Sequence, residues 1–159
     1  LQEVRVPGRS ELVDNKKGLT IMIDYAHSPE SLQSILSAVK SYTRGKVISV
    51  FGCGGDRDKT KRPIMGKIST SIADFTIITS DNPRTEDPDT IVNEIEVGAK
   101  KAKGKYKKIV NRTEAIKYAI NMASKNDIIV LAGKGHETYQ EINGIKHHYD
   151  EREIIKEVI

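Results

Sequence analysis

The stretch "KVISVFGCGGDRDKTKRP", Lys46 to Pro63, joins a run of apolar and β-branched residues to a glycine-rich loop and the start of a helix. A continuous apolar run of this length is typical of a strand that is buried on both faces of a sheet. A strand, a polar loop and a helix in that order begin a βαβ unit. The stretch therefore predicts a strand at Lys46–Gly52 and a helix from about Pro63 to Ile72.

The same alternation of strand-like and helix-like segments continues along the chain, and it predicts an α/β fold. Further strands are expected at Leu19–Asp24, Asp74–Thr79, Lys107–Val110 and Asp127–Gly133. Further helices are expected at Pro29 to about Ser41, from Pro88 towards the lysines near residue 100, at Thr113–Ser124 and after Asp150. The Asn143-Gly144 pair between "YQEI" and "IKHHY" indicates a hairpin. The prediction is thus a Rossmann-like, mostly parallel sheet with flanking helices and a C-terminal antiparallel hairpin.

Length and composition predict one domain over residues 1–159, because 159 residues suffice for one core but rarely form two. The chain has no run of about 18 apolar residues and no secretory leader, so we expect a cytoplasmic protein without a membrane partner. Its single cysteine excludes an internal disulfide framework and a multi-cysteine metal site. Residues 1–9 resemble a segment that leads in from a preceding domain.

Part of the net charge of +4 lies in one lysine-rich run, "KKAKGKYKK" at Lys100–Lys108. Such runs are usually solvated helix ends, and Tyr106 is the one aromatic residue in it, whereas a stacking platform for bases needs more. The sequence therefore does not predict a nucleic-acid partner.

Four polar loops follow four of the expected strands. They read "DYAHSPE" from Asp24, "GCGGDRDKTKR" from Gly52, "SDNPRTEDP" from Ser80 and "AGKGHE" from Ala132. In an open parallel sheet, ligands bind outside the carboxyl ends of the strands, where such loops converge. One polar loop is ordinary, but four on one edge predict a binding site.

Charge recognition is the chemistry that these loops offer. Arg57 and Arg84 can each hold a carboxylate or phosphate through two parallel hydrogen bonds, and Glu137, Asp81 and Asn82 can receive an ammonium group. Together they would suit a zwitterion. Taken singly, each arginine is better explained as a surface residue paired with a neighbour, such as an acidic side chain in the same loop (Asp58, Glu86).

Other reactive side chains have simpler explanations. Cys53 has no base beside it in the sequence and is interpreted as a small buried thiol. His147 and His148 are adjacent on an expected strand, so their side chains point to opposite faces and cannot chelate one metal. Arg112 is interpreted as a turn residue. His27 precedes a helix N-terminus, where it could donate to a phosphate or only fix the turn. His136 is left without a role.

Two motifs are absent from the sequence. It contains no G-x-x-x-x-G-K-S/T phosphate loop, and "FGCGGD" is not the G-x-G-x-x-G of a dinucleotide fold. A nicotinamide enzyme is therefore not expected despite the Rossmann-like sheet.

Five motifs, taken together and in order, closely resemble the C-terminal domain of the Mur ligases. They are "GRSE" at Gly8–Glu11, "DYAHSPESL" at Asp24–Leu32, "FGCGGDRDKTKRPIMG" at Phe51–Gly66, "DNPRTEDP" at Asp81–Pro88 and "AGKGHETYQ" at Ala132–Gln140. Within that family the best match is the MurE type, which adds meso-diaminopimelate to UDP-MurNAc-L-Ala-D-Glu in peptidoglycan synthesis.

The resemblance implies an ATP-dependent, amide-forming ligase with three domains, of which this chain would be the third. ATP phosphorylates the substrate carboxylate, and the amino acid attacks the acyl phosphate. The phosphate loop, the catalytic residues, the Mg²⁺ ligands and the UDP-sugar site would lie in the other domains. The isolated chain is therefore expected to be an inactive monomer with no catalytic or metal-binding residue of its own.

The resemblance also assigns residues to ligands. The diaminopimelate-binding positions correspond to Arg57, Asp81, Asn82, Pro83, Arg84, Gly133 and Glu137. The positions that contact the nucleotide when the domain closes correspond to Arg9, Asp24 and His27. Ser80, where relatives often carry an acidic residue, is a mild departure outside these positions.

Arg84, held behind Pro83, is the expected reader of the distal carboxylate by which diaminopimelate differs from lysine. Lysine would leave the guanidinium desolvated and unpaired, and a site built on such contacts discriminates by roughly 10⁴-fold or more. The alternatives are a related ligase that adds L-lysine or another amino acid, and a stand-alone module that binds a zwitterion or nucleic acid.

Overall fold

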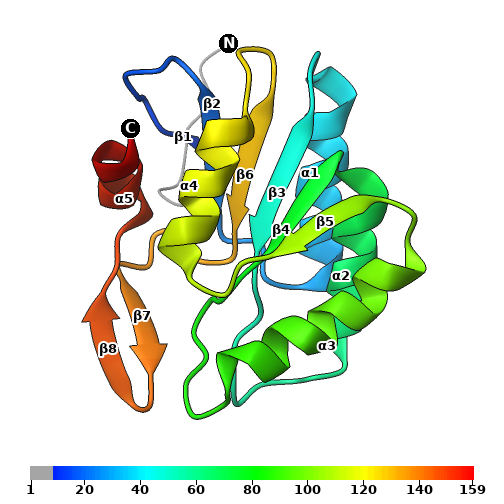
Figure 1. Ribbon diagram of the computed structural model, residues 1–159, viewed down its shortest axis with the longest axis vertical. Helices are drawn as coiled ribbons and strands as arrows, with labels where there is room; N and C mark the ends of the chain where they lie inside the picture. Colours follow the sequence, from blue (N-terminus) through cyan, green and yellow to red (C-terminus); the bar gives the residue numbers. More distant parts are fainter. Residues whose placement is uncertain (1–8) are drawn as a thin grey trace.

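The computed structural model describes residues 9–159, so the predicted leading segment lies outside the described residues except for Arg9. A six-stranded sheet with the order β1-β2-β6-β3-β4-β5 forms the centre of the fold (Figure 1). Strands β2, β6, β3, β4 and β5 run parallel, and the short β1 pairs antiparallel with β2. Strands β7 and β8 form a separate antiparallel hairpin. The predicted fold class is therefore confirmed.

The elements have the following bounds. The strands are β1 Glu11–Leu12, β2 Thr20–Asp24, β3 Val47–Phe51, β4 Phe75–Ile78, β5 Lys105–Lys108, β6 Ile128–Ala132, β7 Tyr139–Ile142 and β8 Ile145–His148. The helices are α1 Pro29–Tyr42, α2 Lys61–Ile72, α3 Pro88–Lys101, α4 Arg112–Met122 and α5 Glu151–Val158.

Helices cover both faces of the sheet, and each face has its own core (Figure 1). Successive strand side chains point to opposite faces. Met22 packs with α1, α2 and α3, whereas Ile21 and Ile23 on either side of it pack with α4 and α5. Because both faces are buried, the central strands read as continuous apolar runs, which is the pattern that the sequence showed.

Most helices begin where the sequence placed a capping residue. Ser28 accepts a hydrogen bond from the backbone of Ser31 and forms a capping box at α1, and Asp87 accepts one from Asp89 at α3. Asp150 accepts from Arg152 at α5. These caps satisfy backbone donors that the first helical turn leaves unpaired, and they fix where each loop ends.

The turn of the hairpin also follows the prediction. Asn143 and Gly144 have φ angles of 51° and 77°, as a two-residue type I′ turn requires. Two strands differ from the predictions. Strand β1 was not predicted, because its two residues are too few to show a periodic pattern. Strand β5 begins at Lys105, two residues before the predicted Lys107. Three of the four residues of β5 are lysines, and β5 is an edge strand, so a search for apolar runs overlooks it.

Candidate functional site

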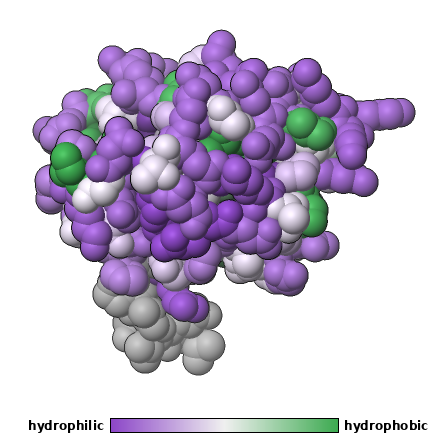
Figure 2. All heavy atoms as spheres, turned by 90° about the horizontal axis from the view of Figure 1, so that it is seen from below, coloured by the Kyte–Doolittle hydropathy of each residue, from purple (hydrophilic) through white to green (hydrophobic). Residues whose placement is uncertain are grey.

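The carboxyl ends of β2, β3, β4 and β6 lie on one edge of the sheet, because these strands are parallel neighbours. The four polar loops of the sequence follow these strand ends. Figure 2 looks onto the molecule from this end and shows a face on which hydrophilic side chains dominate, with only scattered apolar ones. The predicted convergence of the loops is confirmed.

The loop after β4 carries the predicted residues Asp81 to Arg84 and is mostly buried. Asp81 and Asn82 are 8% and 3% exposed. The neighbouring β3–α2 loop packs closely against it, because the Gly55 backbone N–H donates to the Asn82 carbonyl at 2.7 Å. A Cβ at Gly55 would lie 1.8 Å from the Pro83 carbonyl oxygen, so the close approach of the two loops requires glycine at that position.

Lys134 is a fully buried cation at the centre of the site, and the sequence analysis assigned it no role. Its ammonium group donates to Asn82 Oδ1 at 2.9 Å and to the Tyr139 carbonyl at 2.9 Å. It also pairs with Asp81 Oδ1 at 3.1 Å and with Glu137 Oε1 at 3.7 Å. One sequence signal could have pointed to Lys134: it lies between Gly133 and Gly135, directly after a predicted strand, where the backbone turns.

Lys134 changes what the predicted ammonium acceptors can do. Asn82 Oδ1 already accepts from Lys134 and from the Glu141 backbone N–H at 2.9 Å. The Asn82 amide nitrogen donates to Glu137 Oε1 at 3.3 Å. The ammonium group that Asn82 Oδ1 receives in this structure is therefore that of Lys134, and its amide nitrogen is its donor group.

Arg84 is held by strand β7 and by the β3–α2 loop, and it is not paired with the acidic residues of its own loop. Its Nε donates to Glu141 Oε1 at 3.2 Å, and its Nη1 donates to the Gly55 carbonyl at 3.0 Å. The side chain is 16% exposed. The interpretation as an ordinary surface arginine is wrong, and so is the picture of a guanidinium that would be wholly unpaired without a ligand.

Arg57 lies in the β3–α2 loop, and its side chain is exposed. Its Nη1 donates to the Asp56 carbonyl at 3.0 Å. A Cβ added to Gly54 would contact Arg84 Nη1 at 2.8 Å and Arg57 Cγ at 3.7 Å, so the two arginines flank the same glycine. Arg57 is therefore close to the Arg84 loop, and no ion pair within residues 9–159 fixes it.

Arg62, on the first turn of α2, links the β3–α2 loop, which carries Arg57, to the loop after β4, which carries Arg84. It is fully buried, and it donates to the Gly54 carbonyl at 2.9 Å and to both oxygens of Glu86 at 3.0 and 2.8 Å. Glu86 also accepts from the Asp56 backbone N–H. The hydrogen bonds from Arg62 lower the pKa of Glu86 to about 2. Glu86 is therefore paired with Arg62 and not with Arg57 or Arg84.

Arg112 is a second buried arginine, and its interpretation as a turn residue is wrong. It is the first residue of α4, and its side chain is fully buried. It donates to Glu151 at 2.8 Å and to the Ser80 and Ala132 carbonyls at 3.0 and 3.1 Å. Arg112 thus ties the carboxyl ends of β4 and β6 to α5, an arrangement that depends on contacts distant in the sequence.

The residues matched to nucleotide contacts lie near the end of β2. Both carboxylate oxygens of Asp24 are engaged, by the Ser10 N–H at 2.7 Å and by the Ala26 N–H at 2.9 Å. His27 is exposed, with Nδ1 2.8 Å from the Tyr25 carbonyl. Arg9 is exposed beside Ser10. Asp24 therefore organises the backbone, while Arg9 and His27 present their side chains to solvent.

The thiol and the histidines give no catalytic centre. Burial raises the pKa of the Cys53 thiol to about 12, so it is the small buried thiol that the sequence predicted. His148 lies 2.9 Å from Glu153, and the ring of His136 lies 5.7 Å from that of Tyr25. Within residues 9–159, no three His, Cys, Asp or Glu side chains are grouped so that they could hold a metal ion.

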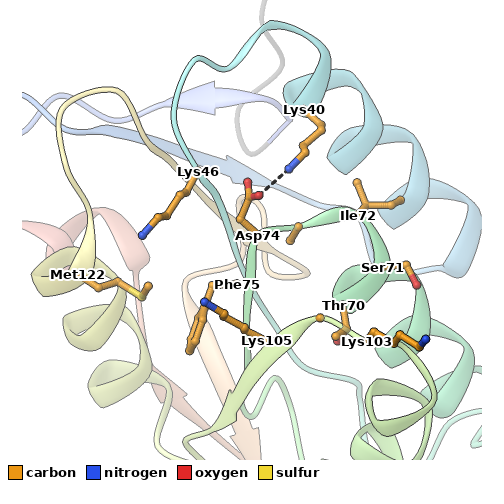
Figure 3. Close-up of a pocket in the computed structure, with 12 residues that line it drawn as sticks. Lys40, Lys46, Thr70, Ser71, Ile72, Asp74, Phe75, Lys103, Lys105 and Met122 are labelled. Atoms are coloured by element: carbon orange, nitrogen blue, oxygen red, sulfur yellow. Dashed lines mark hydrogen bonds and ion pairs between the residues drawn. The ribbon is translucent and has the colours of Figure 1, made fainter.

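A pocket of about 900 Å³ lies at the opposite, amino edge of the sheet. Four lysines line it, namely Lys40, Lys46, Lys103 and Lys105. Figure 3 shows Lys40 reaching Asp74, with the ammonium groups of Lys46 and Lys103 on opposite sides. Both Asp74 oxygens are taken, by Lys40 and by the Val47 N–H. The charged groups that line this pocket are therefore lysines and one fully engaged carboxylate, whereas the carboxyl edge carries several groups of both signs.

Comparisons with known proteins agree with this arrangement. The profile of the family described as Mur ligase, glutamate ligase domain, matches residues 8–135. The chain belongs to the Mur ligase family. This confirms the resemblance on which the site residues were predicted. The matched segment contains the first three loops and the first four residues of the fourth, up to Gly135.

The chain is similar to curated ligases that act on diaminopimelate. It is 50% identical over 154 residues to the UDP-N-acetylmuramoyl-L-alanyl-D-glutamate–2,6-diaminopimelate ligase of Clostridioides difficile, covering 97% of the chain and 32% of the relative. A solved structure of a ligase with the same name superposes with a TM-score of 0.89 at 40% identity, covering 99% of this chain and 32% of that one. The chain thus spans about a third of the length of these Mur ligases.

The Mur ligase fold of this domain extends to more distant enzymes. The bifunctional folylpolyglutamate synthase/dihydrofolate synthase of Yersinia pestis, solved with AMPPNP and a manganese ion, superposes with a TM-score of 0.62. It is 18% identical, and 83% of this chain and 29% of that chain are covered. At this identity the likeness concerns the fold alone.

Among the residues described, no helix is long and apolar enough to cross a membrane.

Proposed function

We propose that this chain is the amino-acid-binding domain of an ATP-dependent ligase that adds meso-diaminopimelate to UDP-MurNAc-L-Ala-D-Glu in peptidoglycan synthesis. The observation that carries the proposal is the cluster around Asn82 and Arg84 at the carboxyl edge. It lies in a chain about half identical to diaminopimelate ligases over nearly its whole length.

The charges of the cluster support an amino acid with balanced charge. Three carboxylates (Asp81, Glu137, Glu141) lie with three cations (Arg57, Arg84, Lys134) around the loop after β4. Diaminopimelate carries two ammonium groups and two carboxylates, so it enters without adding net charge to a partly buried site. Lysine lacks one carboxylate and would add a positive charge, which costs free energy where solvent is partly excluded.

Within this proposal, the two carboxylates and one ammonium group of the ligand have partners whose geometry suits them. Arg84 and the Asn82 amide nitrogen donate, so they would hold carboxylate oxygens. Glu137 accepts and is 17% exposed at its side chain, so it would receive an ammonium group. Gly133 has a φ of 117°, and a Cβ built on it would lie 3.5 Å from Asp81 Oδ2.

ATP and Mg²⁺ would be held mainly outside this chain. The phosphate loop is absent from the sequence, and residues 9–159 offer no group of side chains that fits a resident metal ion. ATP would supply the phosphoryl group that activates the substrate carboxylate. Arg9 and His27, exposed at the end of β2, fit contacts to a nucleotide that arrives with another domain. We expect a cytoplasmic enzyme, and the isolated chain should not form amide bonds.

The test is an amino-acid panel with the full-length ligase that contains this chain, comparing wild type with Arg84→Ala. Two of the three guanidinium nitrogens are already paired within the protein, so we expect Arg84→Ala to lower kcat/KM for diaminopimelate by about 10- to 100-fold, not 10⁴-fold. Unchanged diaminopimelate use would contradict the assignment of Arg84. A wild-type enzyme that prefers lysine would contradict the substrate itself.

A further inference from the structure

Glu141, on β7, contacts two of the three polar residues of the "DNPR" segment, Asn82 and Arg84. Its backbone N–H donates to Asn82 Oδ1 at 2.9 Å, and its carbonyl accepts from the Arg84 N–H at 3.0 Å. Its side-chain Oε1 accepts from Arg84 Nε at 3.2 Å. Glu141 therefore acts on the candidate binding loop through three separate groups, although the motifs that identified the site end at Gln140.

The hairpin that carries Glu141 also fixes the backbone of Arg84. Arg84 has φ of 53°, in the left-handed region that costs a non-glycine residue roughly 1 kcal/mol or more. Its N–H is held by the Glu141 carbonyl, and its own carbonyl accepts from the Asn143 N–H at 2.8 Å. The hairpin thus holds Arg84 on both sides in a conformation that the loop alone would disfavour.

The guanidinium is oriented by contacts from two directions. Glu141 takes Nε, and the Gly55 carbonyl takes Nη1 at 3.0 Å. Among residues 9–159, Nη2 has no hydrogen-bond partner, and it is not a buried unsatisfied atom. Because a guanidinium is planar and rigid, fixing two nitrogens sets the direction of the third. Nη2 is therefore left to an incoming group.

We propose that Glu141 is a positioning residue that aims Nη2 of Arg84 at the distal carboxylate of the amino acid and thereby sets the preference for diaminopimelate over lysine. The inference rests on the proposed function and deepens it. In this proposal Glu141 acts through Arg84 and not through contact with the substrate. Its carboxylate offsets the charge of Arg84 when no ligand is present, and its hydrogen bond removes rotamer freedom that binding would otherwise have to remove.

The experiment uses the full-length ligase and measures KM and kcat for diaminopimelate, lysine and ATP. Glu141→Ala should raise KM for diaminopimelate about 10-fold, with kcat and KM for ATP changed by less than about 3-fold. Glu141→Gln keeps an oxygen that can accept from Nε, so it should retain most of the wild-type KM. Glu153→Ala is the matched control, because this exposed glutamate contacts His148 and not Arg84.

A double-mutant cycle separates positioning from a general structural role. If Glu141 acts through Arg84, Glu141→Ala should have no further effect on diaminopimelate KM in an Arg84→Ala background. Additive effects of the two substitutions, or equal increases in KM for diaminopimelate and ATP, would overturn the inference. So would an unchanged KM in Glu141→Ala while wild type uses diaminopimelate, an outcome that leaves the proposed function standing. A wild-type enzyme that does not use diaminopimelate would contradict both the proposed function and the inference about Glu141.

Discussion

Both edges of the sheet carry charged side chains, but several of these are buried at the carboxyl edge, and the Lys40–Asp74 pair at the amino edge is partly exposed. At the carboxyl edge, Lys134 and Arg112 are fully buried, and each contacts three or more acceptors. At the amino edge, Lys40 and Asp74 pair with side chains 44% and 35% exposed. Burial removes the option of water as a partner, so a buried charge needs several protein partners, whereas an exposed one needs none.

The direction of the parallel strands explains why the edges differ. Each helix begins near the carboxyl edge, where its first backbone N–H groups lack partners, and ends near the amino edge, where its last carbonyls do. Lysines such as Lys40, in the last turn of α1, complement those carbonyls in solvent. At the carboxyl edge, the loops close over the strand ends. A buried cation there, Arg112, donates hydrogen bonds to backbone carbonyls at the ends of β4 and β6.

The largest effect that would test this contrast is expected for Arg112→Ala. The substitution leaves Glu151, which is 1% exposed, as an unpaired buried carboxylate. We expect the free energy of unfolding in urea to fall by about 3–5 kcal/mol. The control is Arg112→Met combined with Glu151→Leu, which should recover much of the loss because no charge remains buried. A loss below about 1 kcal/mol for Arg112→Ala would contradict the distinction between the edges.

An intermediate effect is expected for Glu86→Gln, and it should depend on pH. The pKa of Glu86 is lowered from 4.5 to about 2 by Arg62, so the ionised form stabilises the folded state. This contribution is fully present above pH 4.5 and is lost as the pH falls towards 2. We expect wild type to be more stable than the variant by about 1–2 kcal/mol at pH 7.

Urea unfolding of both proteins between pH 7 and pH 2.5 measures this dependence. The stability difference between wild type and Glu86→Gln should shrink steadily below pH 4.5. A difference that stays constant over this range would show that Glu86 titrates normally, and Arg62 would then not hold it as the hydrogen bonds indicate.

The smallest effect is expected for Lys40→Met, which removes the exposed pair with Asp74 but keeps the apolar stem. The free energy of unfolding should fall by less than about 1 kcal/mol, and the difference should diminish further in about 1 M NaCl, which screens exposed charges. Thermal unfolding at two salt concentrations measures it. A loss as large as that of Arg112→Ala, unaffected by salt, would mean that the two edges are not distinct.

The sequence was sufficient for the fold because local patterns agreed with one another. Apolar runs such as Val47–Phe51 marked the buried strands, and Ser28, Asp87 and Asp150 marked helix starts. The order of strands and helices then placed the polar loops on one edge. Prediction failed for β1 and for the start of β5, where short or lysine-rich edge strands leave no apolar pattern.

The sequence by itself determined the α/β architecture, the family and the loops that form the candidate site, because these depend on local periodicity and contiguous motifs. Only the tertiary structure decided which charges are paired. Arg84 with Glu141, Lys134 with Asn82, and Arg112 with Glu151 join residues 57, 52 and 39 positions apart. Such partners are chosen by how the loops and the hairpin pack, and burial then makes each choice energetically important.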